Sequence, residues 1–353
     1  MAESVRPDQN AKKPEATLRV GLAGLGFMGA THWKAWQRVE QAQIVAVMDL
    51  SQQKLAGDLS SVGGNFGGPG QKLDFSRLRT YRSFEELIQD REIDAVDICL
   101  PTDQHGRAAT AALRAGKHVL VEKPMAIDER ETNALLEEAD KSGRTLMVGQ
   151  ILRFMPAYME LANSLRSAGA IRSAVFRRRC AAPTWSAWLT DSAKSGGGIF
   201  DLLIHDVDYC ISQWGVPRSV RAVGYEELTR GIDVVQAQLE YPQAGPVVVT
   251  GGWFHPGNFP FSMDFSVVTD KNTWEWTSNS NVFNGYGKEG DATSVELPES
   301  DPFLGEVGYF ADCAAHGRAP RRCLPEESAQ AVAVMHRIVE SRQRKGEPVS
   351  CKG

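Results

Sequence analysis

Residues 18–29 read LRVGLAGLGFMG, and this stretch decides the fold of the N-terminal half. Its first part, Leu18–Gly24, is an apolar run that predicts a buried strand. The strand leads directly into a G-x-G-x-x-G turn made of Gly24, Leu25, Gly26, Phe27, Met28 and Gly29. In such a turn the first glycine permits the tight bend, the second lets backbone approach a pyrophosphate, and the third lets the following helix pack on the strand. Because the helix N-terminus also offers free N–H groups, the stretch predicts a dinucleotide site.

Asp49 ends the next apolar strand, Ile44–Asp49, and follows Gly29 by 20 residues. At that distance a carboxylate can accept hydrogen bonds from the hydroxyls of the adenosine ribose. Its charge would repel a 2′-phosphate, and Leu50 and Ser51 supply no arginine to receive one. NAD is therefore favoured over NADP as cofactor. The alternative is that Asp49 is only a polar residue in a strand-end turn.

Strand-like and helix-like segments alternate up to about residue 150. Further strands are predicted at Ala95–Leu100, Lys117–Val121 and Thr145–Gln150. Helices are predicted from the glycine turn to about Val39, from Ser51 onward, and at Phe84–Gln89, Gln104–Ala115 and Glu129–Lys141. This alternation predicts βαβ units in a doubly wound parallel sheet, a Rossmann domain. The glycine-rich stretch 61–70 is predicted to be a mobile loop.

The pattern changes after Gln150, where strand-like segments follow one another across short turns. Strands are predicted at Ile171–Arg178, Val220–Tyr225, Val234–Tyr241, Pro246–Trp253, Ser262–Thr269 and Trp274–Ser278. Helices are predicted at Pro156–Ser167, Gly198–Trp214, Gly305–His316 and Pro325–Arg344. Consecutive strands of this kind favour an antiparallel sheet. The chain is thus predicted to be an α/β protein with a flexible tail at 1–16, an NAD-binding domain at 17–150 and an α+β domain at 151–353.

Composition excludes several classes of protein. The 353 residues include 39 basic and 44 acidic side chains, for a formal net charge of −5, and Arg177–Arg179 is the only run of three basic residues. Neither nucleic acid nor an anionic membrane is an expected partner. Met1–Ala16 lacks the apolar core of a signal peptide, and no apolar stretch approaches the ~18 residues of a membrane span. Six cysteines without a C-x-x-C pair are typical of reduced thiols, so the cytoplasm is the expected location.

Two further segments carry candidate catalytic residues. Lys123 lies in Glu122-Lys123-Pro124 at the end of a strand, at the sheet edge where doubly wound folds bind ligands; alone it could also be a solvated strand-end lysine. Asp201, His205 and Asp208 are spaced i, i+4 and i+7 among apolar neighbours, which places them on one helix face and predicts a buried polar site. A helical His–carboxylate pair could be half of a metal site. No Cys or second His stands at ligand spacing, so no metal is expected.

Together these features resemble the glucose–fructose oxidoreductase / inositol dehydrogenase (Gfo/Idh/MocA) family. The resemblance covers nearly the whole chain from about Leu18, and its landmarks are Gly24–Gly29, Asp49, Pro101–His105, Glu122-Lys123-Pro124, Val148–Tyr158 and Gly196–Asp208. It implies a Rossmann domain followed by a domain with a large, open, mainly antiparallel sheet. In the family that sheet commonly makes dimer or tetramer contacts, so a homodimer or homotetramer is expected.

The resemblance also implies roles for individual residues. The family's Lys–Asp–His arrangement falls on Lys123, Asp201 and His205, and Thr102 and Glu122 correspond to residues on the nicotinamide-ribose side, with His105 in the same cofactor-binding set. Histidine, with an ordinary pKa near ~6.5, suits general acid/base work at neutral pH. Asp201 would orient His205 or the substrate, and Lys123 would stabilise negative charge that develops on the reacting oxygen.

Substrate contacts are expected from the second half of the chain. Trp185 and Trp188 precede the Gly196–Gly198 turn, where indole faces suit sugar C–H surfaces, although they could instead cap the domain core. Arg153 could face the pocket or only bridge the domains. Arg177–Arg179 could mark an anionic sugar or a solvent-exposed strand edge. For Trp253, His255, Trp274 and Trp276, on or near sheet strands, oligomer packing is the favoured use.

Three functions compete at this point. The leading hypothesis is an NAD-dependent dehydrogenase that acts on a secondary hydroxyl of a sugar, sugar derivative or cyclitol. The second is a redox-neutral enzyme that retains NAD and oxidises a sugar transiently to eliminate a C1 substituent, as some relatives with glycosidase activity do. The third is a non-catalytic sugar or NAD sensor, which would tolerate loss of Lys123 or His205, yet both are present.

Overall fold

The protein is described here by a computed structural model that covers residues 17–64, 70–227, 231 and 233–351. The predicted flexible tail, residues 1–16, and residues 65–69 of the predicted glycine-rich loop lie outside the described residues. Among the described residues, no helix is both long and apolar enough to span a membrane. All six cysteines are described, and each carries a free thiol.

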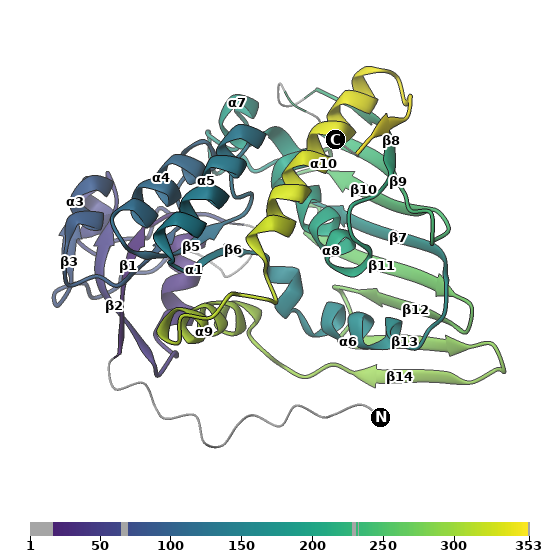
Figure 1. The fold of residues 1–353 in the computed structure, drawn as a ribbon, viewed down its shortest axis with the longest axis horizontal. Coiled ribbons are helices and arrows are strands. Elements are labelled where there is room, and N and C mark those ends of the chain that lie inside the picture. Colours follow the sequence, from purple (N-terminus) through teal and green to yellow (C-terminus); the bar gives the residue numbers. More distant parts are fainter. Residues whose placement is uncertain (1–16, 65–69, 228–230, 232, 352–353) are drawn as a thin grey trace.

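The first half builds a six-stranded parallel sheet in the order β3-β2-β1-β4-β5-β6 (Figure 1). Its strands are β1 (Leu18–Ala23), β2 (Ala42–Met48), β3 (Arg79–Tyr81), β4 (Ala95–Ile98), β5 (His118–Glu122) and β6 (Leu146–Gly149). The order reverses between β1 and β4, which creates the crevice where such sheets bind ligands. The predicted Rossmann sheet is confirmed. β3 was not predicted, because its three residues are exposed or half-buried and carry no apolar run.

Five helices alternate with these strands: α1 (Phe27–Trp36), α2 (Gln52–Leu55), α3 (Phe84–Gln89), α4 (Thr102–Arg114) and α5 (Glu129–Ser142). Local sequence fixes several of their starts. Ser83 caps α3 by accepting from the N–H of Glu86, and Asp128 caps α5 by accepting from the N–H of Arg130. Such side chains satisfy N–H groups that have no partner inside the helix.

The second half builds a nine-stranded sheet in the order β14-β13-β12-β11-β7-β10-β9-β8-β15. Its strands are β7 (Ile171–Arg179), β8 (Ser219–Tyr225), β9 (Val234–Glu240), β10 (Val247–Gly252), β11 (Ser262–Thr269), β12 (Asn272–Thr277), β13 (Val282–Gly287), β14 (Ala292–Glu296) and β15 (Val349–Ser350). The sheet is mainly antiparallel, as predicted, but β10 pairs with β7 in parallel. Sequence did not predict β13, β14 or β15; all five residues of β14 are exposed, so no alternation marks it.

Helices cover one face of this sheet. The helical segments of the second half of the chain are η1 (Ile151–Phe154), α6 (Pro156–Leu165), α7 (Ser192–Ser195), η2 (Ile199–Leu203), α8 (Ile204–Trp214), α9 (Pro302–Ala315) and α10 (Pro325–Gln343). Figure 1 shows α6, α8 and α10 in front of the strands. Along β9, Val235, Ala237 and Leu239 are buried whereas Gln236 and Gln238 are exposed, which is the alternation of a sheet with one packed face.

Helix α9 returns to the first sheet although it belongs to the second half of the chain. It packs on α1, and its Val307 and Phe310 share a buried cluster with Trp36. The edge of the ring of Trp36 meets Phe310 at a centroid distance of 6.3 Å. The parallel sheet ends at β6, close to the boundary predicted at Gln150, but residues beyond that boundary complete its helical cover.

Tryptophans for which oligomer packing was favoured are instead buried within the chain. Trp253, Trp274 and Trp276 are 1%, 7% and 8% exposed, so they are core side chains. His255 stacks on Phe259 with ring centroids 4.2 Å apart. The sequence shows that these residues are aromatic and lie on or near strands. It does not show which face of the sheet the helices of the same chain cover.

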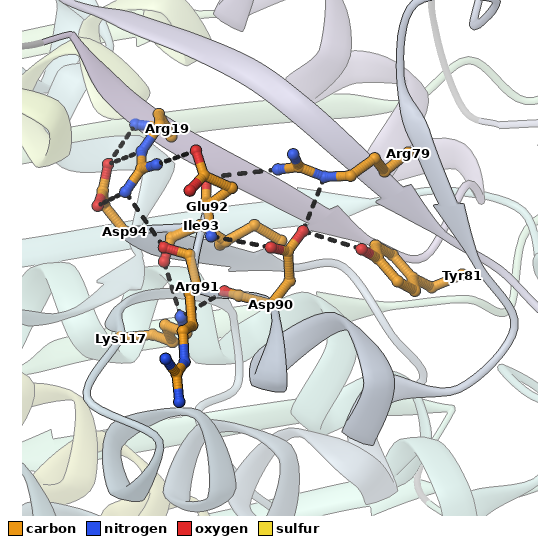
Figure 2. Close-up of polar contacts among 9 residues, drawn as sticks. All are labelled: Arg19, Arg79, Tyr81, Asp90, Arg91, Glu92, Ile93, Asp94 and Lys117. Carbon is orange, nitrogen blue, oxygen red and sulfur yellow. Dashed lines mark hydrogen bonds and ion pairs between the residues drawn. The ribbon is translucent and has the colours of Figure 1, made fainter.

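A polar cluster joins the amino ends of the parallel strands, opposite the edge that binds ligands (Figure 2). Arg19 at the start of β1 forms a bidentate pair with Asp94, with Nε 2.9 Å and Nη2 2.8 Å from the carboxylate oxygens. Lys117, just before β5, is 7% exposed and donates to the carbonyl oxygens of Asp90 and Ile93, both at 2.7 Å. These contacts tie the loop that precedes β4 to its neighbours.

Replacing Lys117 with Met should destabilise the protein without affecting ligand binding. The change leaves the carbonyl oxygen of Ile93 without its donor, whereas that of Asp90 keeps the backbone N–H of Ile93. A buried unpaired polar group costs about 1–3 kcal/mol. Urea unfolding measures the loss in the free energy of unfolding. Lys141→Met, at an exposed lysine, is the matched control and should cost less than about 0.5 kcal/mol. Equal midpoints for the two variants would contradict the assignment.

Candidate active site

A cavity of about 740 Å³ lies at the carboxyl ends of the parallel strands. One wall comes from the ends of β1, β2, β4, β5 and β6, and the other from the loop 185–189, η2, α8 and β11. The cavity brings together nearly all residues that the sequence singled out: Gly24, Gly26, Phe27, Met28, Asp49, Thr102, His105, Glu122, Lys123, Trp185, Trp188, Asp201 and His205. Gly29 and Arg153 are not among its lining residues.

The three glycines of the turn do different work. Gly24 has φ +94°, and a Cβ there would lie 2.5 Å from the carbonyl oxygen of Cys99. A Cβ on Gly29 would lie 1.9 Å from the carbonyl oxygen of Gly24, so helix and strand pack too closely for a side chain. A Cβ on Gly26 would meet nothing within 4 Å, because this backbone faces the cavity. An open backbone at the start of α1 suits a pyrophosphate.

Asp49 lines the cavity and also holds the turn. Its carboxylate accepts from the backbone N–H of Leu25 at 2.9 Å and of Ser51 at 2.8 Å. Lys54 Nζ lies 3.4 Å away, a cation that the sequence reasoning missed because Lys54 belongs to the next helix. The two interpretations of Asp49 are therefore compatible, since one carboxylate can fix the turn and face the ribose.

Thr102 and His105 lie on the first turn of α4 and are buried, 3% and 1% exposed. The two ring nitrogens of His105 each lie 2.7 Å from a backbone carbonyl oxygen, that of Pro124 and that of Leu100. Burial lowers the pKa of His105 despite these acceptors. The ring therefore links the loop after β4 to the loop after β5, and it borders the cavity from that position.

Lys123 and Asp201 form an ion pair at the junction of the two halves. Lys123 Nζ donates to the carbonyl oxygen of Asp201 at 2.6 Å and to its Oδ1 at 3.1 Å. The side chains are 13% and 23% exposed, so the pair is half-buried and borders the cavity. The Glu122 carboxylate accepts the backbone N–H of Lys123 at 3.0 Å, which fixes the backbone before the cis Lys123–Pro124 peptide.

His205 lines the same cavity from the first turn of α8. Its Nδ1 is buried without a hydrogen-bond partner among the described residues. Burial, and then the positive charges of Lys123 and Arg178, lower the pKa of His205 well below its ordinary value. The ring is therefore neutral at pH 7 and can accept a proton.

The sequence predicted a regular α-helix for the segment that carries Asp201, but the structure differs. Residues Ile199–Leu203 form a π-helical turn, and the α-helix begins at Ile204. Such turns are rare and occur often at functional sites. Asp208, predicted to share the polar face with Asp201 and His205, is turned away from the cavity and pairs with Arg153.

Arg153 bridges elements and does not line the cavity. Its Nε and Nη2 donate to Asp208 at 2.9 and 2.7 Å, and its Nη1 pairs with Glu327 at the start of α10. The Arg153 side chain is 5% exposed and that of Asp208 is 0% exposed. Of the two roles that the sequence left open for Arg153, the contacts are those of the structural bridge.

The three consecutive arginines lie on β7, an interior strand, so the alternative of a strand edge is wrong, although the Arg177 side chain is 46% exposed. Arg178 is buried and pairs with Asp206, with Nε 2.9 Å from Oδ2. Arg177 and Arg179 point to the other face and both pair with Asp264 on β11. Arg178 borders the cavity, but its charge is already compensated.

The two tryptophans of the loop have different surroundings. Trp185 is 39% exposed, and its ring meets the edge of Phe27 in the glycine turn at a centroid distance of 5.7 Å. Trp188 packs against a small buried cluster of Cys180, Leu189, Leu202 and Trp253. Both line the cavity. Trp188 also packs on the domain core, whereas Trp185 reaches across to the first domain, and their contact with substrate stays a prediction.

A buried ionic cluster beneath Glu122 was missed by the sequence reasoning. His32 on α1 lies 2.8 Å from Asp97 and 3.0 Å from Glu122, and Glu306 of α9 lies 3.9 Å away. His32 follows Gly29 by three residues and could have been noticed, but nothing near Glu306 in the sequence marks it. His32 belongs to two groups of possible ligand atoms, one with Asp97 and Cys99 and the other with Glu122 and Glu306, and the atoms within each group lie within 4.8 Å of one another. Burial raises the pKa of the Cys99 thiol, which disfavours a thiolate, and the absence of a metal stays a prediction.

The fold and the cavity define a Rossmann-type, dinucleotide-binding protein. Residues 18–150 match the model of the oxidoreductase family with an NAD-binding Rossmann fold, and residues 166–275 match the Gfo/Idh/MocA C-terminal domain. The chain belongs to the Gfo/Idh/MocA family. The resemblance stated from the sequence is confirmed, and with it NAD as the cofactor of the first domain.

Curated relatives match part of the chain. It is 30% identical over 223 residues to UDP-N-acetylglucosamine 3-dehydrogenase of Acidithiobacillus ferrooxidans, a match that covers 63% of each chain. It is 32% identical over 195 residues to inositol 2-dehydrogenase of Rhizobium meliloti, covering 54% of this chain and 53% of that one. The chain therefore spans between about half and two thirds of the length of these relatives.

Solved structures agree with the fold along nearly the whole chain. A levoglucosan dehydrogenase in complex with NADH and levoglucosan superposes with a TM-score of 0.82 at 19% identity, covering 96% of this chain and 100% of that one. The UDP-N-acetylglucosamine 3-dehydrogenase of Acidithiobacillus ferrooxidans superposes with a TM-score of 0.77 at 23% identity, covering 93% and 98%. At these identities the superpositions establish the fold.

Replacing Asp49 with Ser should shift cofactor preference from NAD towards NADP. The change removes the carboxylate and releases Lys54, which can then meet a 2′-phosphate. The ratio of NAD to NADP affinity, measured by calorimetry, should fall by about tenfold or more, the loss of one charged hydrogen bond.

The double variant Asp49→Ser, Lys54→Met is the matched control. Its affinity for NADP should return to that of the parent, whereas its affinity for NAD should stay as low as in the single variant. An unchanged ratio in the single variant would show that Asp49 only fixes the turn.

Proposed function

We propose that the protein is an NAD-dependent oxidoreductase that transfers hydride between a secondary hydroxyl of a sugar, sugar derivative or cyclitol and nicotinamide. One observation carries this proposal: Lys123, Asp201 and His205 line the same cavity as the Gly24–Met28 turn and Asp49. An acid/base group and a phosphate-binding backbone therefore open into one space. The names of the two relatives above, UDP-N-acetylglucosamine 3-dehydrogenase and inositol 2-dehydrogenase, support the same class of activity.

His205 is the proposed general base. Its neutral ring borders the cavity, and its buried Nδ1 has no hydrogen-bond partner among the described residues. A base of this kind accelerates proton transfer by about 10²–10⁴-fold when it is held within reach of the proton. Bound NAD would supply the hydride acceptor; the chain supplies the proton acceptor.

Lys123 is proposed to stabilise negative charge on the substrate oxygen. Asp201 holds its ammonium through two oxygens, which leaves a third N–H direction for a substrate hydroxyl. A cation fixed in this way reduces the cost of deprotonating an alcohol, since it needs no reorganisation during the reaction. Asp201 positions Lys123 and so acts on the reacting oxygen through it.

Thr102, His105 and Glu122 are proposed to border the nicotinamide ribose, and Trp185 and Trp188 to contact the substrate. The two indoles lie on the side of the cavity contributed by the second half, across from the strand ends. Flat apolar faces suit the C–H surfaces of a sugar ring. The open face of the nine-stranded sheet is proposed to make the contacts of a homodimer or homotetramer, and the free thiols fit a cytoplasmic protein.

His205→Ala should lower kcat for NAD reduction by about 10²–10⁴-fold while NAD affinity stays within about twofold. A panel of polyols and sugars, followed by NADH absorbance, gives kcat, and fluorescence titration gives the cofactor affinity. His316→Ala, at a histidine on the surface, is the matched control. Unchanged turnover in the His205 variant would contradict its role. Release of an aglycone without net NADH would favour the redox-neutral alternative.

The pH dependence of the reaction should reflect the low pKa of His205. Protonation removes the base, so kcat/KM for alcohol oxidation should be level near pH 7 and fall only at pH values below the ordinary ~6.5. Lys123→Met removes one of the positive charges that lower this pKa, so the acid limb of the residual activity should move up towards ~6.5. The pH–rate profiles of the two proteins measure this shift. An identical acid limb in both would assign it to another group.

A further inference from the structure

Four ionisable side chains from four elements meet beneath the cofactor cavity. They are His32 on α1, Asp97 on β4, Glu122 at the end of β5 and Glu306 on α9. His32, Asp97 and Glu306 are 0% exposed and Glu122 is 6% exposed. Three carboxyl groups thus surround one imidazole in the interior, and only Glu122 also lines the cavity.

Three of the four groups have identifiable partners. Asp97 Oδ2 lies 2.8 Å from His32 Nδ1 and accepts from Trp36 Nε1 at 2.7 Å. His32 Nε2 lies 3.0 Å from Glu122 Oε1, and Glu122 Oε2 accepts the backbone N–H of Lys123 at 3.0 Å. A cationic His32 between Asp97 and Glu122 therefore balances part of the charge.

Glu306 is different. Neither of its carboxyl oxygens has a hydrogen-bond partner among the described residues, and no Lys or Arg of those residues forms an ion pair with it. An ionised carboxylate in this position would be buried, unsolvated and close to a second carboxylate. A buried group of this kind takes up a proton rather than remain charged.

Glu122 is the natural acceptor for a hydrogen bond from the protonated Glu306. Oxygen atoms of Glu122 and Glu306 lie within 4.8 Å of one another and of the His32 ring. Both also approach Gly149 at the end of β6: a Cβ there would lie 3.3 Å from Glu306 Oε1 and 3.5 Å from Glu122 Oε1. Gly149 thus leaves the space in which the two carboxyl groups face each other.

We propose that Glu306 is held as a neutral carboxylic acid whose O–H donates a hydrogen bond to Glu122, and that it positions Glu122 at the base of the cofactor cavity. This inference rests on the proposed function only in its last step, the effect on cofactor binding. Glu306 touches neither cofactor nor substrate in this scheme. It is a positioning residue that acts through Glu122, and it makes the second half of the chain part of the cofactor site.

The directions of the pKa shifts agree with this arrangement. Burial, and then the charges of Glu122 and Asp97, raise the pKa of Glu306 well above its ordinary value, against the opposing effect of His32. Burial also acts to raise the pKa of Glu122, but contact with His32 and the charges of His32 and Lys123 outweigh it and lower that pKa. The groups that face Glu306 are His32 from α1, Asp97 from β4, Glu122 from β5 and Cys323 before α10.

The pH dependence of unfolding tests the protonation of Glu306. A carboxyl group that is protonated in the folded state and ionised in the unfolded state releases one proton on unfolding, so stability falls as pH rises between its two pKa values. The variant Glu306→Gln cannot release this proton. The unfolding constant of the parent, divided by that of the variant, should therefore rise about tenfold per pH unit at pH values above the ordinary pKa of a glutamate and below the raised pKa of Glu306.

Glu299→Gln, at an exposed glutamate in the stretch that precedes α9, is the matched control and should give a ratio that does not change with pH in this range. A flat ratio for Glu306→Gln would overturn the proposal. Infrared spectra offer a second readout that does not depend on unfolding: the carbonyl band of a protonated carboxyl group should be present in the parent at neutral pH and absent in Glu306→Gln. Neither measurement needs substrate or cofactor, so their outcome is separate from that of the proposed function.

Cofactor titrations test the positioning role. Glu306→Gln keeps an N–H donor of the same shape and should bind NAD within about twofold of the parent, whereas Glu306→Leu removes the donor and should bind NAD about tenfold more weakly, the value of one hydrogen bond to a charged group. Equal affinities in the two variants would overturn this role. Metal analysis of the purified parent distinguishes a proton from a cation between the two carboxyl groups, and no bound metal is expected. One equivalent of metal in the parent that is lost in Glu306→Gln would overturn the proposal.

Discussion

The helical segment formed by η2 and α8 carries three acidic side chains, and each of them pairs with a cation from another element. Much of the structure depends on these three ion pairs. Asp201 on η2 pairs with Lys123 from the end of β5, Asp206 on α8 pairs with Arg178 from β7, and Asp208 pairs with Arg153 from η1. Removing one partner from a buried pair costs about 3–5 kcal/mol, because the remaining charge stays buried alone. The segment is therefore fastened to the parallel sheet, to the nine-stranded sheet and to the connection between them.

The three ion pairs differ in how deeply they are buried, and this difference separates the structural pairs from the one at the cavity. The Asp206–Arg178 and Asp208–Arg153 pairs are almost fully buried, with side-chain exposures of 5% or less, whereas the Lys123–Asp201 pair is 13% and 23% exposed at the cavity wall. Of the three pairs, only the half-buried one borders the cavity through both of its side chains. His205 lies between these anchors, where burial and then the charges of Lys123 and Arg178 lower its pKa, so its ring is neutral.

Helix α9 also connects the second half of the chain to the first domain through buried charged groups. It comes from the second half of the chain, covers α1 and places Glu306 against His32 and Glu122. The cavity is therefore not a simple cleft between two independent units, since its floor depends on a helix that returns after residue 300. A boundary drawn at Gln150 describes the order of the sheets but not the packing of the helices.

The parts of the fold and site that the sequence determined are local. The glycine turn at 24–29, Asp49, the Glu122-Lys123-Pro124 step and the spacing of Asp201 and His205 could be recognised because each function needs particular residue types within a few positions. Regular apolar periods also predicted most strands, since one face of each must be buried.

Tertiary structure decided the remaining strand pairings and ion pairs, because no short segment of sequence shows which distant residues it will contact. It paired β10 with β7 in parallel, turned Asp208 towards Arg153, placed Arg177–Arg179 on an interior strand, and brought Lys54 to Asp49 and Glu306 to Glu122. Whether a buried charge meets a partner depends on elements far away in the chain. The sequence by itself thus determined the cofactor turn and the candidate chemistry, and only the packing of distant elements determined which charged residues face the cavity.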